Sequence, residues 1–502
     1  MLNRRSVVKA WVDNMTKRTL PLRKISTIGL LLSITWAYSA CTIGPDFVQP
    51  KSVVPQSFIR QNTDLNQSNV DSSQKIRSNW WQDYGSAELN ALVELALKNN
   101  FDIEAASANL RVAQANVRAQ QGYFFPTIGL GYNTSRQNTG SAIQPAVYGP
   151  DQNNSIYTLK TSGISVGFVP DIWGGNRRQV ESLKALGNAS SYQLEALRIT
   201  VANNVLAAAI QEASLREQLV SVKQLAASAK AQLDHARRLR DSGYASSVDL
   251  ALQEGLYAQA IAQMPIIEKS REQTLNLLNV LCGQMPSEKL LLPNLDQIKV
   301  PAQLPSSLPA ELLNQRPDIK IAEEYVRSAN AQIGVALANM LPQFNVLASA
   351  GSATAVVADI ADQVSKIWSI SGGVSQTLFA GGTLFSRKQA ADAATDGAVA
   401  QYKSTVLFAY QNVADTLYAL QSDKTYLNAA LQNENASKVI FDQARNQFRV
   451  GYISEPVKLQ TEQTYLQAKI NRLQASATYL GDTTSLFQAL GGGWSLEKSK
   501  IY

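Results

Sequence analysis

Residues 236–260 read ARRLRDSGYASSVDLALQEGLYAQA, and residues 444–468 read ARNQFRVGYISEPVKLQTEQTYLQA. The two stretches align at a constant offset of 208 positions, where Ala, Arg, Gly-Tyr, Ser, Glu, Tyr and Gln-Ala coincide. Each has helical spacing on both sides of its Gly-Tyr pair, which predicts a turn at the tip of a helical hairpin. Two copies are too few for a solenoid. The repeat therefore predicts one body with two halves, each of which carries a helical hairpin.

The net charge of the chain is concentrated at its beginning. The 502 residues carry a formal net charge of +7, and the first forty contain seven basic residues and one acid. Without that segment, 39 basic and 38 acidic residues remain, a net charge of +1. A basic surface for nucleic acid is therefore not expected.

The first forty residues have the pattern of an export signal. Four basic residues between positions 17 and 24 precede the apolar run 28–38, which is too short to span a bilayer. The pattern does not decide between Met1 and Met15 as the start. One alternative for the segment is an ordinary signal peptide that is cut at another position.

Small residues Ser39 and Ala40 precede Cys41, and this arrangement resembles a bacterial lipobox. The resemblance implies that residues 1–40 are a lipoprotein signal peptide and that Cys41 carries the lipid. Thr42 follows the cysteine, where Asp retains lipoproteins of known families in the inner membrane. The resemblance therefore implies the outer membrane.

The other reactive residues do not form a catalytic or metal-binding set. Cys282 is the only other cysteine, and His235 is the only histidine. Without a cysteine or acidic cluster at ligand spacing, neither a metal site nor a cofactor is expected. The sequence also contains no P-loop, dinucleotide fingerprint or Gly-x-Ser-x-Gly motif, so we do not expect an enzyme. We expect Cys282 to be a buried structural thiol.

Two segments of each half have the period-two pattern of a strand. In the first of them, Ile128, Leu130 and Tyr132 alternate with glycine and asparagine. Near ten residues apiece is the length of a membrane-spanning strand. The pattern predicts four strands, at about 126–136, 157–169, 343–351 and 367–379.

Long helices are expected on both sides of each tip. The stretch 175–242 contains no proline and would be on the order of 100 Å long as a helix. Ser246 and Asp249 predict an approximate capping box for the helix that returns from the first tip, and Ser454 is expected to cap its counterpart. A seam with the three- and four-residue spacing of coiled coils runs along the first long helix at Leu215, Leu219, Val222, Ala226, Ala229 and Leu233.

Four strands with one apolar face cannot lie alone in lipid. The edge strands would leave N–H and C=O groups unpaired, at a cost of several kcal/mol each. Copies of the chain must therefore close the sheet. Two chains would give eight strands and three would give twelve, and the pattern alone does not choose. The alternative is a soluble helical coiled coil whose strands are loops, which the paired proline and Gly-Gly boundaries oppose.

Residues 308–351, LPAELLNQRPDIKIAEEYVRSANAQIGVALANMLPQFNVLASAG, resemble the OprM/NodT class of outer-membrane efflux lipoproteins, relatives of TolC. Shorter matches are CTIGPDF from Cys41, DIWG from Asp171, LFAGG from Leu378 and ALGGGW from Ala489. The resemblance implies a TolC-like α+β membrane protein with two structural repeats, each with a β-hairpin and a long α-helical hairpin. It also implies a homotrimer with a twelve-stranded β-barrel and a periplasmic α-helical barrel.

Repeat, boundaries and resemblance together predict a division of the chain into successive segments. These are a signal peptide at 1–40, a lipidated N-terminal tether at 41–79, a first repeat at 80–283 with its tip at 241–249, a linker in the equatorial region at 284–307, a second repeat at 308–491 with its tip at 449–457, and a C-terminal tail at 492–502.

The resemblance implies that the chain is the passive exit duct of a tripartite efflux or export system for small molecules. The implied partners are two further copies of the chain, a periplasmic adaptor, an inner-membrane pump of the RND type and outer-membrane lipid. The alternative is a structural or adaptor lipoprotein of the envelope without channel activity. An envelope enzyme is a more distant alternative, because no acid–base or nucleophile set is present.

The family places a gate at the periplasmic tips. Its first-tip aspartate corresponds to Asp249, six residues after Gly243, and a ring of three such carboxylates would favour cations. Phe448 stands where the family has tyrosine, so the family's Asp–Tyr hydrogen bond is not expected. A solvated tip is the alternative for the charges. The remaining candidate residues of the tips are Asp241, Tyr244, Arg449, Gly451 and Tyr452.

Overall fold

The computed structural model describes residues 42–50, 77–138, 156–301, 316–354 and 366–494. The predicted signal peptide, the lipidation site Cys41 and the end of the predicted C-terminal tail lie outside the described residues, as do parts of the tether and of the linker. The chain divides into two compact units. Apart from these gaps, the first unit comprises 42–46, 118–182 and 330–392, and the second comprises 47–117, 183–329 and 393–494.

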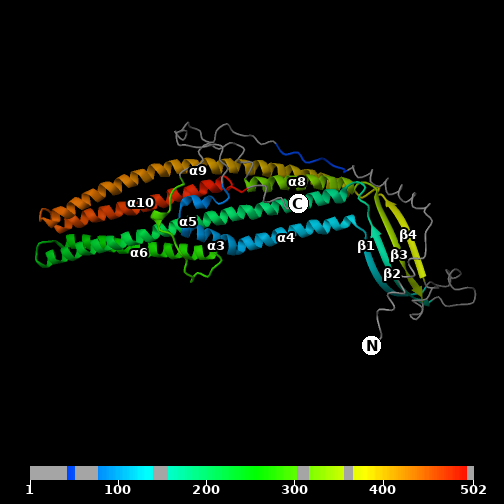
Figure 1. Cartoon of the computed structure of the whole chain (residues 1–502), viewed down its shortest axis with the longest axis horizontal. Coiled ribbons are helices and arrows are strands. Elements are labelled where there is room, and N and C mark those ends of the chain that lie inside the picture. Colours follow the sequence, from blue (N-terminus) through cyan, green and yellow to red (C-terminus); the bar gives the residue numbers. More distant parts are fainter. Residues whose placement is uncertain (1–41, 51–76, 139–155, 302–315, 355–365, 495–502) are drawn as a thin grey trace, which may run out of the picture. The chain divides into compact units, whose positions relative to one another are not determined.

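The first unit contains a four-stranded antiparallel sheet with the strands in chain order (Figure 1). The first repeat supplies one hairpin and the second repeat the other, and β2 pairs with β3 between them. β4 ends at Ser375, earlier than the sequence predicted, because Ser375 pairs with Gln343, the first residue of β3, and no further residue of β3 is available to pair. The strands are β1 (Thr127–Asn138), β2 (Ile156–Phe168), β3 (Gln343–Thr354) and β4 (Lys366–Ser375).

The register gathers the large apolar residues on one face of the sheet. Ile128 lies opposite Val166, and Leu130 lies opposite Ile164. Directly opposite residues of neighbouring strands share a face, so even-numbered residues of all four strands lie on the same side. The other side carries mostly glycine, serine, threonine and asparagine. Leu130 is 85% exposed in the single chain, as expected for a face that needs a partner or a lipid environment.

The long helices come in two sets with the same offset of 208 as the sequence repeat. α5 (Gly175–Asp241) and α9 (Thr383–Arg449) have 67 residues each, and α6 (Ser247–Leu281) and α10 (Glu455–Ala489) have 35 each. None of the helices in the described ranges combines the length and the hydropathy that a transmembrane helix requires. The shorter helices are α3 (Ala87–Asn99), α4 (Phe101–Gln121) and α8 (Pro317–Ala338), with 3-10 turns η3 (Trp80–Tyr84), η4 (Gly122–Phe124) and η6 (Leu295–Gln297).

The predicted seam of α5 is buried along its whole length. Its six apolar residues are all less than 10% exposed. Small polar residues lie between them: Ser214 Oγ donates to the carbonyl oxygen of Leu473 at 3.0 Å, and Ser228 Oγ donates to that of Leu459 at 3.4 Å. The α5–α10 contact therefore includes short polar side chains whose hydroxyl groups donate to backbone carbonyl oxygens, as buried polar groups require.

The largest core of the second unit lies around α3 and η3. The Trp80 ring stacks on that of Phe487 with 4.8 Å between centroids, and the Tyr84 hydroxyl lies 2.8 Å from that of Thr483. Cys282 is fully buried in the same cluster, where burial raises the pKa of its thiol to about 11. The prediction of a buried structural thiol is confirmed.

Candidate functional site

Both tips end their long helix in the same way. Gly243 follows α5 at φ 81° and Gly451 follows α9 at φ 76°, in the left-handed region. The amides of the next residues, Tyr244 and Tyr452, donate to the carbonyl oxygen five residues earlier, at 2.8 and 2.9 Å. This is the Schellman arrangement, in which glycine is preferred because a side chain would be strained at positive φ. It explains the Gly-Tyr pair in each copy of the repeat.

The helix that returns from the first tip begins with the predicted capping box. The Asp249 N–H donates to Ser246 Oγ at 3.0 Å, and the Ser246 N–H donates to Asp249 Oδ2 at 3.0 Å. The Ser246 hydroxyl also donates to this carboxylate oxygen at 2.7 Å. Its hydrogen bond, followed by that of the backbone N–H, lowers the pKa of Asp249. The carboxylate predicted for the gate is thus held at the start of its own helix.

The second tip has no equivalent cap. Ser454 is the N-cap residue of α10, but its side chain accepts no capping hydrogen bond, so the predicted cap is wrong. Pro456 occupies the first turn of α10 and lacks an N–H. An N-cap side chain usually accepts a hydrogen bond from the N–H group two or three residues further on, and Pro456 removes the first of these two donors.

The other residues at the tips are either charged or apolar. Asp241 and Arg449 are exposed and form no ion pair within the described part of the chain. Phe448 lies under the Lys458 ammonium group, 5.1 Å from its ring centroid. The apolar residues are the most exposed: Tyr244, Val248, Val450 and Tyr452 have between 75% and 84% of their surface in solvent.

Sequence reasoning missed a site on the segment that follows Cys41. Arg178 is 3% exposed and donates to the carbonyl oxygens of Ile43 and Gly44, both at 3.1 Å, and to Asp46 Oδ1 at 2.8 Å. Gly44 fits because a Cβ there would lie 2.6 Å from the Cα of Gly334. Residues 42–46, at the start of the predicted tether, are therefore docked within the first unit.

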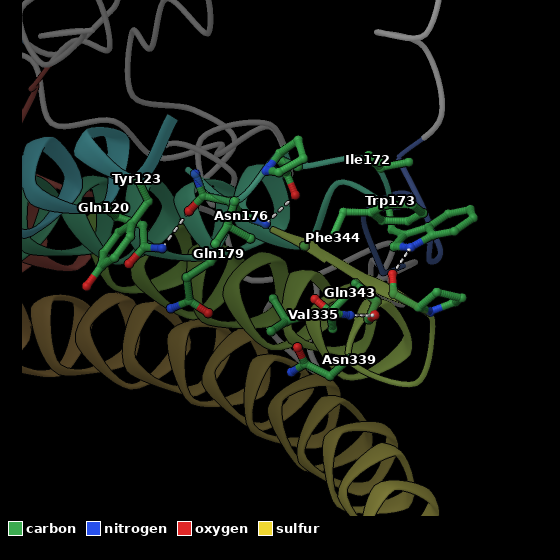
Figure 2. Close-up of a pocket in the computed structure, with 16 residues that line it drawn as sticks. Gln120, Tyr123, Ile172, Trp173, Asn176, Gln179, Val335, Asn339, Gln343 and Phe344 are labelled. Carbon is green, nitrogen blue, oxygen red and sulfur yellow. Dashed lines mark hydrogen bonds between the residues drawn. The ribbon is translucent and has the colours of Figure 1, made fainter. Parts of the chain in front are cut away.

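The junctions between strands and helices line an open cavity of about 460 Å³ in the first unit (Figure 2). It lies between the end of β2 and start of α5 on one side and the end of α8 and start of β3 on the other. Asp171 accepts from the N–H groups of Asn176 and Arg177, both at 2.9 Å, and so caps α5. Gln120 Nε2 donates to Asn176 Oδ1 at 2.6 Å across the cavity wall. The cavity thus lies where the two repeats meet.

Within the described ranges, no three His, Cys, Asp or Glu side chains converge on a point that could hold a metal ion. The described residues instead present an apolar sheet face, apolar tips and a docked N-terminal segment.

The sequence model for outer membrane efflux proteins matches residues 92–284 and 308–492, most of the chain. The chain belongs to the outer membrane efflux protein family. The pyoverdine export outer membrane protein OpmQ of Pseudomonas putida is 28% identical over 427 residues, which cover 83% of this chain and 88% of OpmQ. The chain and this relative therefore match over more than four fifths of the length of each.

Solved structures of channels give the same answer for the fold of this efflux protein. The outer-membrane channel OprN has 25% sequence identity and a TM-score of 0.79, and the match covers 90% of this chain and all of OprN. The open state of the MtrE channel of Neisseria gonorrhoeae, at 24% identity, has a TM-score of 0.78 over 90% of this chain and 98% of MtrE. The predicted TolC-like fold with two repeats is confirmed. The protein is the outer-membrane channel component of an efflux system, as predicted.

Proposed function

We propose that three copies of this chain close into a passive duct, without catalytic activity, through which an efflux system releases small molecules. The observation that carries the proposal is the open four-stranded sheet with one apolar face. Within the described residues, β1 and β4 each pair on one side only. Such edges are costly in lipid, so copies of the sheet must pair edge to edge.

Three copies fit the requirements of a duct better than two. An eight-stranded barrel is only wide enough to be filled by its own side chains, whereas larger barrels leave a lumen. The inward face would carry the glycine, serine, threonine and asparagine of the odd-numbered positions, which suits a wet lumen. The resemblance of the sequence to the OprM/NodT class implies the same number.

The experiment is to purify the protein in detergent and to measure its mass and its conductance. We expect the mass of three chains, a trimer that heating in SDS converts to monomer, and discrete current steps in planar bilayers. A monomer that gives no current steps would leave only a structural or adaptor role.

We further propose that a periplasmic adaptor docks on the tips and links the duct to an inner-membrane pump of the RND type. The exposed Val248 and Val450 support an apolar contact at this end. A photo-reactive residue at either position should cross-link to the adaptor in cells. The same residue at the exposed Ile266 of α6 is the control and should give no adaptor product.

Lipidation of Cys41 belongs to the same proposal. Residues 42–46 are held by Arg178, which would keep a lipid on Cys41 close to the first unit. The wild-type protein should incorporate labelled palmitate, and Cys41→Ser should not. Incorporation by the variant would place the lipid elsewhere.

A gate role of Asp249 can be separated from its capping role. Asp249→Asn removes the charge but keeps an oxygen that can accept from the Ser246 N–H, whereas Ser246→Ala removes the cap and keeps the charge. If three carboxylates form the constriction, Asp249→Asn raises leak conductance and lowers cation preference, and Ser246→Ala leaves ion preference unchanged. Equal conductance and selectivity in wild type and Asp249→Asn would remove Asp249 from the gate.

A further inference from the structure

The four strands carry three charged side chains, and all three are basic. They are Arg136 on β1, Lys160 on β2 and Lys366 on β4, and no aspartate or glutamate occurs in any of the four strands. The register places even-numbered residues of all four strands on one face. The three cations therefore share the face of Leu130 and the other large apolar residues.

The cations lie at the end of the sheet that is remote from the helices. β1 starts after α4 and η4, and β2 leads into α5, so Thr127 and Phe168 mark the helix end. Lys366 lies level with Tyr132 through the pairs of Ser352 and Ser162. Lys160 lies opposite Thr134, two residues further from the helices than Tyr132, and Arg136 lies four residues further than Tyr132. The positions of Lys366 and Arg136 along the strands therefore differ by about 14 Å.

The apolar face changes in character along the strands in a fixed order. On the apolar face, the side chains between the levels of Val374 and Trp368 are all apolar or small. These two residues of β4 are six positions apart, which is about 20 Å along the strand. Trp368 and Tyr132 lie at the end of this stretch that is remote from the helices, and they are 77% and 60% exposed. Lys366 lies level with Tyr132, and the other two cations lie further from the helices. The face thus carries an apolar band, then an aromatic girdle, and then a basic rim formed by Arg136, Lys160 and Lys366. A membrane has the same order of acyl chains, interface and anionic headgroups.

The basic rim has no anionic partner within the described chain. No ion pair joins Arg136, Lys160 or Lys366 to another described residue. The nearest carboxylates in the sequence, Asp151, Asp359 and Asp362, lie in the two connecting segments outside the described residues. Arginine and lysine on a carboxylate-free strand surface suit phosphate, which arginine can bind with two parallel hydrogen bonds.

We propose that Arg136, Lys160 and Lys366 bind the phosphate groups of the glycolipid in the outer leaflet of the outer membrane. The rim lies at the hairpin ends of the strands, away from the helices that enter the periplasm. A headgroup with a phosphate at each end of a sugar pair can contact two of these cations at once. The proposal goes beyond the channel function, since it concerns the lipid-facing side of the sheet.

The test uses the purified full-length protein and measures binding of bisphosphorylated lipid A and of lipid A without phosphate. Wild type should prefer the phosphorylated form, and each of Arg136→Gln, Lys160→Gln and Lys366→Gln should weaken binding about fivefold. The triple variant should lose the preference. A control with Lys184→Gln, Lys269→Gln and Lys403→Gln changes the net charge equally on exposed helix positions and should retain it.

Each other outcome overturns the proposal. Equal binding of lipid A by wild type and the triple variant would show that the rim does not contact the phosphates. Equal affinity for phosphatidylglycerol would assign the rim to anionic phospholipid in general. If the triple variant fails to assemble, the three single variants decide, and unchanged affinity in all three is then the contradicting result.

Discussion

The indole Nε1 of Trp173 donates a 2.7 Å hydrogen bond to the backbone carbonyl oxygen of Pro342 (Figure 2). Trp173 follows β2 and Pro342 precedes β3, so the bond joins the strand junctions of the two repeats within the first unit. It also gives a physical role to the tryptophan of the Asp-Ile-Trp-Gly motif.

Trp173→Phe should lower stability because it leaves the Pro342 carbonyl oxygen without this donor. The loss of one partly buried hydrogen bond is expected to cost about 1–2 kcal/mol. The measurement is the thermal midpoint of the purified protein by circular dichroism. Trp368→Phe is the matched control, because no described residue accepts a hydrogen bond from the Trp368 indole and the change keeps an aromatic ring at that position, so the midpoint should stay nearly unchanged. Equal shifts of the thermal midpoint in both variants would show that the hydrogen bond to Pro342 does not stabilise the protein.

Arg178→Ala should release the N-terminal segment. Three of its acceptors lie on residues 43–46, and Arg178 is almost fully buried, so the variant removes three of the hydrogen bonds that hold that segment. Amide hydrogen exchange over residues 42–46 should become at least about tenfold faster, the equivalent of 1.4 kcal/mol.

Asp46→Asn is the control for the Arg178 variant. The Asp46 side chain is 92% exposed and retains an acceptor oxygen after the change, so exchange over the segment should rise only slightly. If Asp46→Asn opened the segment as fully as Arg178→Ala, the ion pair and not the two carbonyl contacts would hold it.

Local patterns predicted the elements of this fold because their signals are strong and repeated. The seam from Leu215 to Leu233 follows helical spacing, and the alternation around Leu130 follows strand spacing, so each could be recognised without knowledge of the other. The capping box at Ser246 and Asp249 was equally local. Ser454 failed as a cap for a local reason too, since the proline that suits the first turn removes a donor.

Contacts between distant residues could not be predicted in this way. Arg178 and Ile43 are 135 positions apart, and Trp173 and Pro342 are 169 apart. No periodicity links such pairs, because they meet only once the helices and strands have packed. The basic rim lies between these cases: its residues are visible in the sequence, but only the register between strands shows that they share a face.

Gly451→Ala and Gly397→Ala should have opposite effects, although both replace an exposed glycine at one of the helices of the second repeat. Gly451 has φ 76°, where a Cβ costs about 1 kcal/mol, whereas Gly397 lies in the interior of α9, where alanine is favoured by about 0.5–1 kcal/mol. Neither new Cβ would meet another atom within 4 Å. Hydrogen exchange should become faster around 451 and slower around 397. The same sign at both sites would contradict the role assigned to backbone conformation.

Asp482 predicts an unusual dependence of stability on pH. Burial raises its pKa from 3.8 to about 6, together with a hydrogen bond to Asp423 and the negative charge of that residue. A carboxyl whose pKa is raised by folding stabilises the protein only while it is protonated. Its contribution is therefore complete below about pH 4 and is lost as the pH rises through about 6.

Asp482→Asn should remove this dependence and make the protein more stable near pH 7. Because Asp482 is only partly buried, solvent screening reduces the expected gain to about 1 kcal/mol. Thermal midpoints of wild type and variant should converge below pH 4 and separate between pH 4 and 6. Asp423→Asn should give a similar gain, since it removes the like charge, and the double variant should add little. Fully additive gains, or a constant difference at every pH, would show that the two carboxyl groups do not titrate as a pair.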